Sequence, residues 1–117
     1  MRDLVPSLAL VVEDDQLQRD FLSDVLKEED FDVIECDSAE AAELIVAKCG
    51  ADLTLVVTDY SLAGVATGAD LAAFTRKMFP YLPILVVSGE SRGQLPDKVK
   101  FLRKPYLASD LVGAIQR

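Results

Sequence analysis

The feature that most constrains the fold of this chain is a regular alternation of two kinds of segment. Short, almost continuously apolar runs rich in Val, Leu and Ile alternate with longer segments whose apolar residues recur at helical spacing. Continuous apolar runs are typical of strands buried on both faces, and such strands occur in parallel sheets covered by helices. The alternation therefore predicts an α/β domain of three layers, α/β/α, around a parallel sheet.

The expected elements follow from these runs and from the turn residues between them. Strands are predicted at residues 8–12, 32–35, 53–58, 83–88 and 99–103, and helices at 16–28, 39–48, 68–78 and 109–116. Ser38 is the expected N-cap of the second helix, which Gly50 ends. For five strands we expect the flavodoxin-like order 2-1-3-4-5.

Two helices and one connection carry more detailed expectations. Leu17, Phe21, Leu22, Val25 and Leu26 fall at helical spacing, which predicts an amphipathic helix over 16–28. In the helix at 68–78 we expect Leu71, Phe74 and Met78 to face inward. Residues 89–98 show little periodicity and contain Gly93 and Pro96, so they leave room for at most a shortened fourth helix.

Length and composition limit the classes of function. The chain has 117 residues, which fits one domain spanning 1–117, and a net charge of −8, which argues against direct binding to nucleic acid. No signal-peptide pattern and no apolar run of about 20 residues is present, so we expect a cytoplasmic protein without a membrane partner. Histidine is absent, which removes His-based triads, and Cys36 and Cys49 are expected to be reduced thiols.

Polar residues follow four of the apolar runs at the point where each predicted strand ends. They are Glu13-Asp14-Asp15, Asp59, Ser88 and Lys104-Pro105. In open parallel sheets, ligands bind in the crevice beyond the carboxyl ends of the strands. These residues are therefore expected to meet in one site.

The chemistry of that site follows from its charges. Two ionised carboxylates about 4 Å apart repel by roughly 4 kcal/mol at an effective dielectric constant near 20, so Glu13, Asp14 and Asp59 need a cation or raised pKa values. Carboxylate oxygens and waters favour Mg²⁺, which leaves positions for phosphate oxygens. Lys104 supplies a positive charge, Ser88 supplies a hydroxyl, and a carboxylate can act as the nucleophile that forms an aspartyl phosphate.

At these residues the sequence resembles the receiver domains of two-component response regulators, and the resemblance covers nearly the whole chain. Val11-Val12-Glu13-Asp14-Asp15 resembles the acidic motif, Thr58-Asp59 the phospho-acceptor, Val87-Ser88-Gly89 the Ser/Thr motif, and Phe101 to Pro105 the aromatic and Lys-Pro motif. One such motif is weak evidence, but four in this order are strong.

The resemblance implies a role for each residue of the acidic site. Asp59 is the nucleophile that accepts phosphate from a histidine kinase or a histidine phosphotransfer protein. Asp14 and Asp59 bind Mg²⁺ directly, Glu13 contributes through water, and the backbone carbonyl of Ser61 is a further ligand. Lys104 pairs with a phosphoryl oxygen, so the domain catalyses its own phosphotransfer and dephosphorylation while acting mainly in signalling.

The resemblance also implies a switch, and the sequence departs from the family most in one region. Ser88 and Phe101 are the switch pair, Glu90 and Ser61 match positions that tune phosphate lifetime, and the bond before Pro105 is expected to be cis. The segment between Ser88 and Phe101 is short, as in receivers attached to, or working beside, hybrid sensor kinases, and unlike that of chemotaxis-type receivers. The alternative that the receiver is a stand-alone, single-domain protein stays open.

Two alternatives belong to other classes of function. The first is a receiver-like interaction module that is not phosphorylated, which the complete set of acceptor, metal, hydroxyl and lysine positions disfavours. The second is a small flavodoxin-like cofactor carrier, but the loop after the first strand is acidic and lacks a phosphate cradle of backbone N–H donors.

Overall fold

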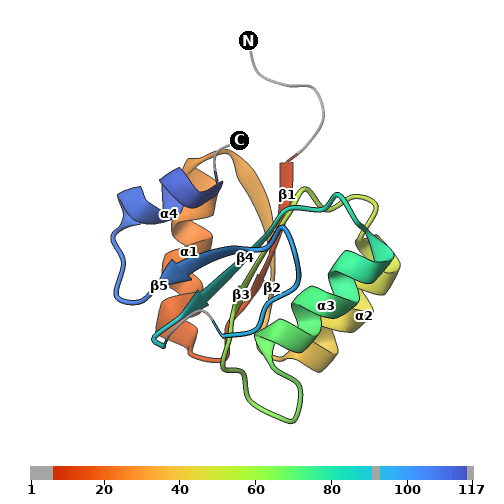
Figure 1. The fold of residues 1–117 in the computed structure, drawn as a ribbon. Coiled ribbons are helices and arrows are strands. Elements are labelled where there is room, and N and C mark those ends of the chain that lie inside the picture. The colour runs from red at the N-terminus through yellow and green to blue at the C-terminus, as the bar shows by residue number, and fades with distance from the viewer. Residues whose placement is uncertain (1–6, 91–92, 116–117) are drawn as a thin grey trace.

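The fold is a single parallel sheet between two layers of helices, as the alternation predicts (Figure 1). The computed structural model describes residues 7–90 and 93–115. In these residues five strands pair in the order β2-β1-β3-β4-β5, which confirms the predicted strand order. The strands are β1 (Ser7–Val12), β2 (Phe31–Cys36), β3 (Leu55–Asp59), β4 (Ile84–Ser88) and β5 (Lys100–Arg103).

Helices cover both faces of this sheet. The helices are α1 (Gln16–Glu28), α2 (Ala39–Cys49), α3 (Gly68–Met78) and α4 (Ala108–Ile115). Figure 1 shows α1 and α4 on one face and α2 and α3 on the other. Gln116, the predicted end of the last helix, lies outside the described residues. Within those residues, each helix is too short or too polar to cross a membrane.

The core is divided by the sheet into two apolar clusters, because successive side chains of a strand point to opposite faces. In β1, Leu10 and Val12 belong to the cluster beneath α2 and α3, whereas Ala9 and Val11 belong to the cluster beneath α1 and α4. All four are fully buried. Burial on both faces explains why this strand is continuously apolar in sequence.

One predicted inward position is wrong, and one residue of the amphipathic pattern in α1 is exposed. In α3, Met78 is 43 % exposed, whereas Leu71 is fully buried and Phe74 is partly buried, as predicted. In α1, Leu17 lies at helical spacing but is 81 % exposed. Both exposed residues lie in a terminal turn, where a helix end is least covered by the strands it packs on. Spacing assigns a residue to a face of a helix but does not show how far the sheet extends beneath it.

The connection between β4 and β5 forms turns, and its described residues include no helix. The segment is held by contacts instead. Leu95 packs on the cluster beneath α2 and α3, Val99 is buried, and Arg76 of α3 donates to the backbone carbonyl of Lys98. Lys98 has a φ of 63°, which turns the chain toward β5.

Candidate functional site

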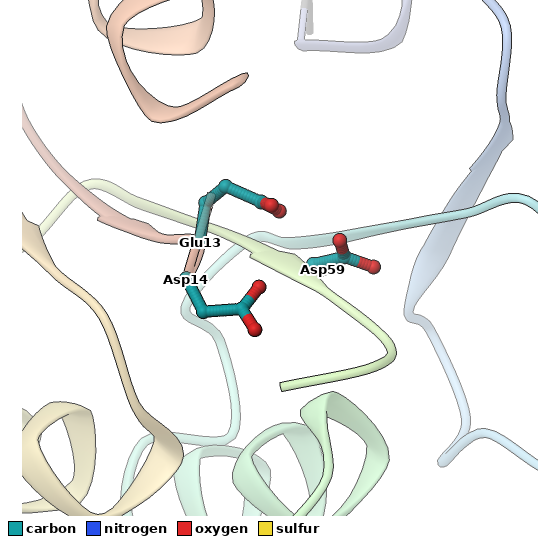
Figure 2. Close-up of side chains that lie close together, drawn as sticks. All are labelled: Glu13, Asp14 and Asp59. Atoms are coloured by element: carbon teal, nitrogen blue, oxygen red, sulfur yellow. The ribbon is translucent and has the colours of Figure 1, made fainter. Parts of the chain in front are cut away.

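Three carboxylates gather beyond the adjacent ends of β1 and β3. Val12 pairs with Thr58 in the sheet, so the next residues of the two strands, Glu13 and Asp59, come together at its edge. One carboxylate oxygen from each of Glu13, Asp14 and Asp59 lies within 4.8 Å of the other two. Figure 2 shows the three side chains in this arrangement. The structure thus brings together the acidic residues that the sequence placed in one site.

Glu13 is the least accessible of the three carboxylates. Its side chain is 1 % exposed, and Oε2 is a buried oxygen without a hydrogen-bond donor in the described part of the chain. Burial, followed by the proximity of Asp59, raises the pKa of Glu13; the Lys104 charge and a hydrogen bond from the backbone N–H of Asp15 act in the opposite direction. A cation would satisfy this orphaned oxygen, so the donor set fits a hard divalent metal.

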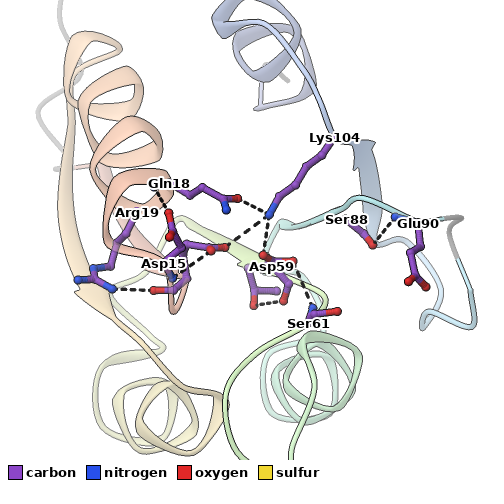
Figure 3. A network of polar contacts seen from close by, with 10 residues as sticks. Asp15, Gln18, Arg19, Asp59, Ser61, Ser88, Glu90 and Lys104 are labelled. Atoms are coloured by element: carbon purple, nitrogen blue, oxygen red, sulfur yellow. Dashed lines mark hydrogen bonds and ion pairs between the residues drawn. The ribbon is translucent and has the colours of Figure 1, made fainter.

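Lys104 enters the site from the end of β5. Its Nζ donates to Oδ2 of Asp59 at 2.6 Å and lies 3.8 Å from Oε2 of Glu13. Nζ also donates to Oε1 of Gln18 (Figure 3). The backbone N–H of Lys104 donates to the carbonyl of Ser88 at 2.7 Å, and the following bond to Pro105 is cis, as the resemblance implies. The predicted lysine therefore reaches the predicted nucleophile.

The other predicted site residues border this centre. The backbone N–H of Ser61 donates to Oδ1 of Asp59 at 3.2 Å. Ser88 is 3 % exposed, and its hydroxyl oxygen accepts from the backbone N–H of Glu90 at 3.1 Å. Phe101 is partly buried against the cluster beneath α2 and α3. Asp59 therefore has defined partners for both oxygens, whereas Ser88 bonds within its own loop.

Residues of α1 that sequence reasoning missed also support the site. Gln18 contacts Lys104, and Arg19 donates from Nη1 to the carbonyl of Glu13 at 2.8 Å while its Nε lies 3.4 Å from Oε1 of Glu35. Asp15 is the N-cap of α1, accepting from the N–H of Gln18 at 2.9 Å. The sequence feature that could have pointed to Gln18 is its position three residues after Asp15, the residue that caps α1, which places it in the helical turn nearest the site.

The loop between β3 and α3 is tied down close to the site. Gly68 donates its N–H to the carbonyl of Tyr60 at 2.8 Å, and a Cβ at Gly68 would lie 2.0 Å from the carbonyl oxygen of Asp59. Oε2 of Glu40 accepts from the N–H of Ala66 at 3.2 Å. Only glycine fits where α3 begins, because the helix starts directly against the backbone of Asp59.

An apolar groove of about 560 Å³ adjoins Lys104. The ring centroids of Phe21 and Tyr106 lie 6.0 Å apart with their planes tilted by 52°, and Leu17 is highly exposed in the same groove. Burial, followed by the charges of Glu13 and Asp59, raises the pKa of Tyr106 to about 12. The groove is lined by Leu17, Gln18, Phe21, Gly89, Lys104, Pro105 and Tyr106.

Comparison with known proteins identifies the class to which this fold and site belong. The family model of the response regulator receiver domain matches residues 9–116. The response regulator protein FleR of Pseudomonas aeruginosa is 31 % identical over 116 residues, which cover 92 % of this chain and 24 % of that protein. The chain thus spans about a quarter of the length of this relative.

Solved structures agree with this assignment. The response regulator receiver protein from Sinorhizobium medicae has a TM-score of 0.86 and 25 % identity, covering 97 % of this chain and 94 % of that one. CheY in the CheX-CheY complex with BeF₃ and Mg²⁺ from Borrelia burgdorferi shares the fold, with a TM-score of 0.84 at 16 % identity, covering 95 % and 87 % of the two chains. The chain belongs to the receiver domain family of two-component response regulators.

Proposed function

We propose that residues 1–117 form one phosphorelay receiver domain in which Asp59 accepts a phosphoryl group from a phosphohistidine donor, with Mg²⁺ bound. The observation that carries the proposal is the contact between Nζ of Lys104 and Oδ2 of Asp59 at 2.6 Å, beside two further carboxylates. A nucleophile, a cationic partner and an all-oxygen donor set are the components that phosphoryl transfer requires.

In the proposed reaction an oxygen of the Asp59 carboxylate attacks phosphorus, so a new O–P bond forms as the N–P bond of phosphohistidine breaks. The donor nitrogen keeps the electron pair of the broken bond and takes up a proton from solvent. The product is an aspartyl phosphate. Because the chain has no histidine, the donor imidazole must belong to a histidine kinase or a histidine phosphotransfer protein outside these 117 residues.

The residues around Asp59 divide the remaining work. Asp14 and Asp59 would hold Mg²⁺ directly, Glu13 through a water, and Ser61 through its backbone carbonyl. Oε2 of Glu13, which accepts no hydrogen bond from the described residues, supports this fit. Bound Mg²⁺ supplies positive charge that offsets the charge of the phosphoryl oxygens. Lys104 would move from Oδ2 of Asp59 to a phosphoryl oxygen, which keeps the charge of the site balanced.

Ser88 and Phe101 would carry the state of the site outward. The Ser88 hydroxyl accepts from Glu90 at present, and its O–H can donate to a phosphoryl oxygen on Asp59. Phe101 is partly buried and would move further inward once Ser88 is drawn toward the phosphate. Glu90 and Ser61, which contact Ser88 and Asp59, would tune the lifetime of the phosphate.

A protein donor fits the surroundings of the site. The apolar groove beside Lys104 exposes Leu17 and part of Phe21, which suits contact with a protein surface rather than with a small polar molecule. The proposed setting is the cytoplasm, without direct contact to nucleic acid or a membrane. The phosphorylated domain would then change its interaction with a downstream protein partner.

The test is phosphorylation by acetyl phosphate, followed by intact mass. With Mg²⁺ the wild type gains one phosphoryl group, and it gains none when the metal is chelated. Asp59→Asn gains none in either condition, whereas Asp52→Asn, a change at an exposed loop carboxylate, behaves as the wild type. An unmodified wild type, or an equal adduct on Asp59→Asn, would contradict the proposal and favour an interaction module that is not phosphorylated.

A further inference from the structure

We propose that Gln18 is a positioning residue for Lys104, holding its ammonium group beside Asp59 where it meets the incoming phosphoryl group. The inference rests on the proposed transfer to Asp59 and adds a residue to it. The contact joins two residues that lie 86 positions apart in the chain, so it comes from the tertiary arrangement of α1 and β5.

Two acceptors of different kinds hold the ammonium group of Lys104. Oδ2 of Asp59 carries charge and lies 2.6 Å from Nζ, whereas Oε1 of Gln18 is a neutral amide oxygen. Oε2 of Glu13 lies 3.8 Å away, beyond hydrogen-bond distance. The ammonium group of lysine lies at the end of a flexible four-carbon stem, so a single anchor at Asp59 leaves it poorly directed. Gln18 supplies the second anchor (Figure 3).

The backbone of Gln18 is itself fixed to the acidic site. Its N–H donates to Oδ2 of Asp15 at 2.9 Å, and the N–H of Asp15 donates to Oε1 of Glu13 at 3.2 Å. Arg19, the next residue, donates from Nη1 to the carbonyl of Glu13 at 2.8 Å. The first turn of α1 is thereby held to the end of β1, and the amide of Gln18 is presented to Lys104 from a rigid element.

A neutral second anchor suits the chemistry better than a charged one. While Lys104 donates to Oδ2 of Asp59, it reduces the nucleophilicity of that oxygen, so the ammonium group must move to the phosphoryl group during transfer. An amide oxygen keeps the ammonium group near the site without neutralising its charge. A carboxylate in the same place would compete with the phosphoryl oxygens for it.

The decisive variant is Gln18→Leu, which removes the acceptor while keeping similar size and helix propensity. A hydrogen bond to a charged group contributes about 1.5 kcal/mol at the low end, so phosphorylation by acetyl phosphate should slow by about tenfold. Mg²⁺ affinity, measured by calorimetry, should stay unchanged, because the side chain of Gln18 contacts Lys104 and none of the three carboxylates of the proposed metal site. The matched control is Gln16→Leu, at an exposed glutamine of the same helical turn, which should phosphorylate at the wild-type rate.

A second readout does not depend on activity. The ¹⁵N resonance of the Lys104 ammonium group should be visible in the wild type and in Gln16→Leu but broadened in Gln18→Leu, where solvent exchange is faster. Gln18→Glu, which keeps an acceptor, should retain the resonance and still slow phosphorylation. Three results would overturn the inference. They are an unchanged phosphorylation rate and Lys104 resonance in Gln18→Leu, an equal loss of rate and resonance in Gln16→Leu, and a lost resonance in Gln18→Glu. If the wild type is not phosphorylated, the proposed function fails separately, and the resonance still decides whether Gln18 holds Lys104.

Discussion

Nη2 of Arg76 donates to the backbone carbonyl of Lys98 at 3.2 Å, and this bond joins the last turn of α3 to the segment that leads into β5. Nη1 of the same guanidinium donates to the carbonyls of Pro80 at 3.0 Å and Leu82 at 2.7 Å. One side chain therefore joins the loop between α3 and β4 to the connection between β4 and β5, whose described residues contain no helix. Burial lowers the pKa of Arg76; arginine side chains remain protonated in proteins.

Replacing Arg76 by methionine should destabilise the domain. The variant leaves several loop carbonyls without their donor, and hydrogen bonds from a charged donor contribute roughly 1.5–3 kcal/mol. We expect a loss of about 2 kcal/mol in the free energy of unfolding, measured by urea denaturation. Lys77→Met, at the exposed neighbouring position, should change it by less than about 0.5 kcal/mol. Equal effects of the two variants would show that Arg76 does not hold these loops.

Two glycine-to-alanine changes should have opposite signs. A Cβ at Gly68 would lie 2.0 Å from the carbonyl oxygen of Asp59, so Gly68→Ala should cost about 1–3 kcal/mol and weaken Mg²⁺ binding by displacing the end of β3. Gly113 lies within α4 and a Cβ there meets no atom within 4 Å, so Gly113→Ala should stabilise the domain by about 0.5–1 kcal/mol. Thermal unfolding of both variants is the measurement, and a stabilised Gly68→Ala would contradict the crowding at Asp59.

Removal of the Lys104 charge should affect stability and metal affinity in opposite directions. In Lys104→Met the carboxylates of Asp59 and Glu13 lose their cationic neighbour, so the metal-free protein should lose about 1–3 kcal/mol of stability. Mg²⁺ no longer meets a nearby positive charge, and its affinity should rise by about fivefold, equivalent to roughly 1 kcal/mol. Calorimetric titration and urea unfolding measure the two quantities. Lys48→Met makes the same change in net charge at an exposed position, so a similar gain in affinity there would refute a local effect.

The thiol of Cys36 should react slowly in the folded protein. Burial raises its pKa to about 11 from an ordinary value of 9.0, although a backbone hydrogen bond from Ser38 and the charge of Arg19 act in the opposite direction. The raised pKa favours the neutral thiol, so its contribution to stability is complete below pH 9 and is lost as the pH rises through about 11. At pH 8 the thiolate fraction, and with it the rate of alkylation by iodoacetamide, should be about a hundredfold below that of the unfolded chain.

A Cys49→Ser background leaves Cys36 as the only thiol for this measurement. Mass spectrometry then follows alkylation of the folded protein and of the same variant in urea. Equal rates in the two conditions would mean that the Cys36 thiol is not shielded.

Much of the fold and the acidic centre could be predicted because both depend on short-range patterns. The strand at β1 is apolar at every position from Leu8 to Val12, and a strand buried on both faces has few alternatives to the middle of a parallel sheet. Once β1 and β3 are parallel neighbours in the sheet, Glu13 and Asp59 lie near each other at its edge, whatever their separation in sequence. The roles of these residues in metal binding and phosphoryl transfer stay predictions.

The contacts of long side chains were not predictable in the same way. Gln18 and Arg76 are ordinary helix residues by sequence. Gln18 meets Lys104, and Arg76 meets the carbonyl of Lys98, only because their helices pack near the residues that follow and precede β5. The exposure of Leu17 and Met78 likewise depends on how far each helix extends past the sheet. Periodicity within a segment carries no information on either point.

The sequence by itself determined the order of strands and helices along the chain, because the apolar pattern of each segment limits which faces it can bury. Together with the strand order expected for a five-stranded flavodoxin-like sheet, it also predicted the edge at which the acidic residues meet. Only the tertiary structure decided that Gln18 holds Lys104, that Arg76 secures the connection into β5, and that this connection forms turns. Those outcomes depend on distances between side chains of separate elements, which become defined only when the two layers of helices pack on the sheet.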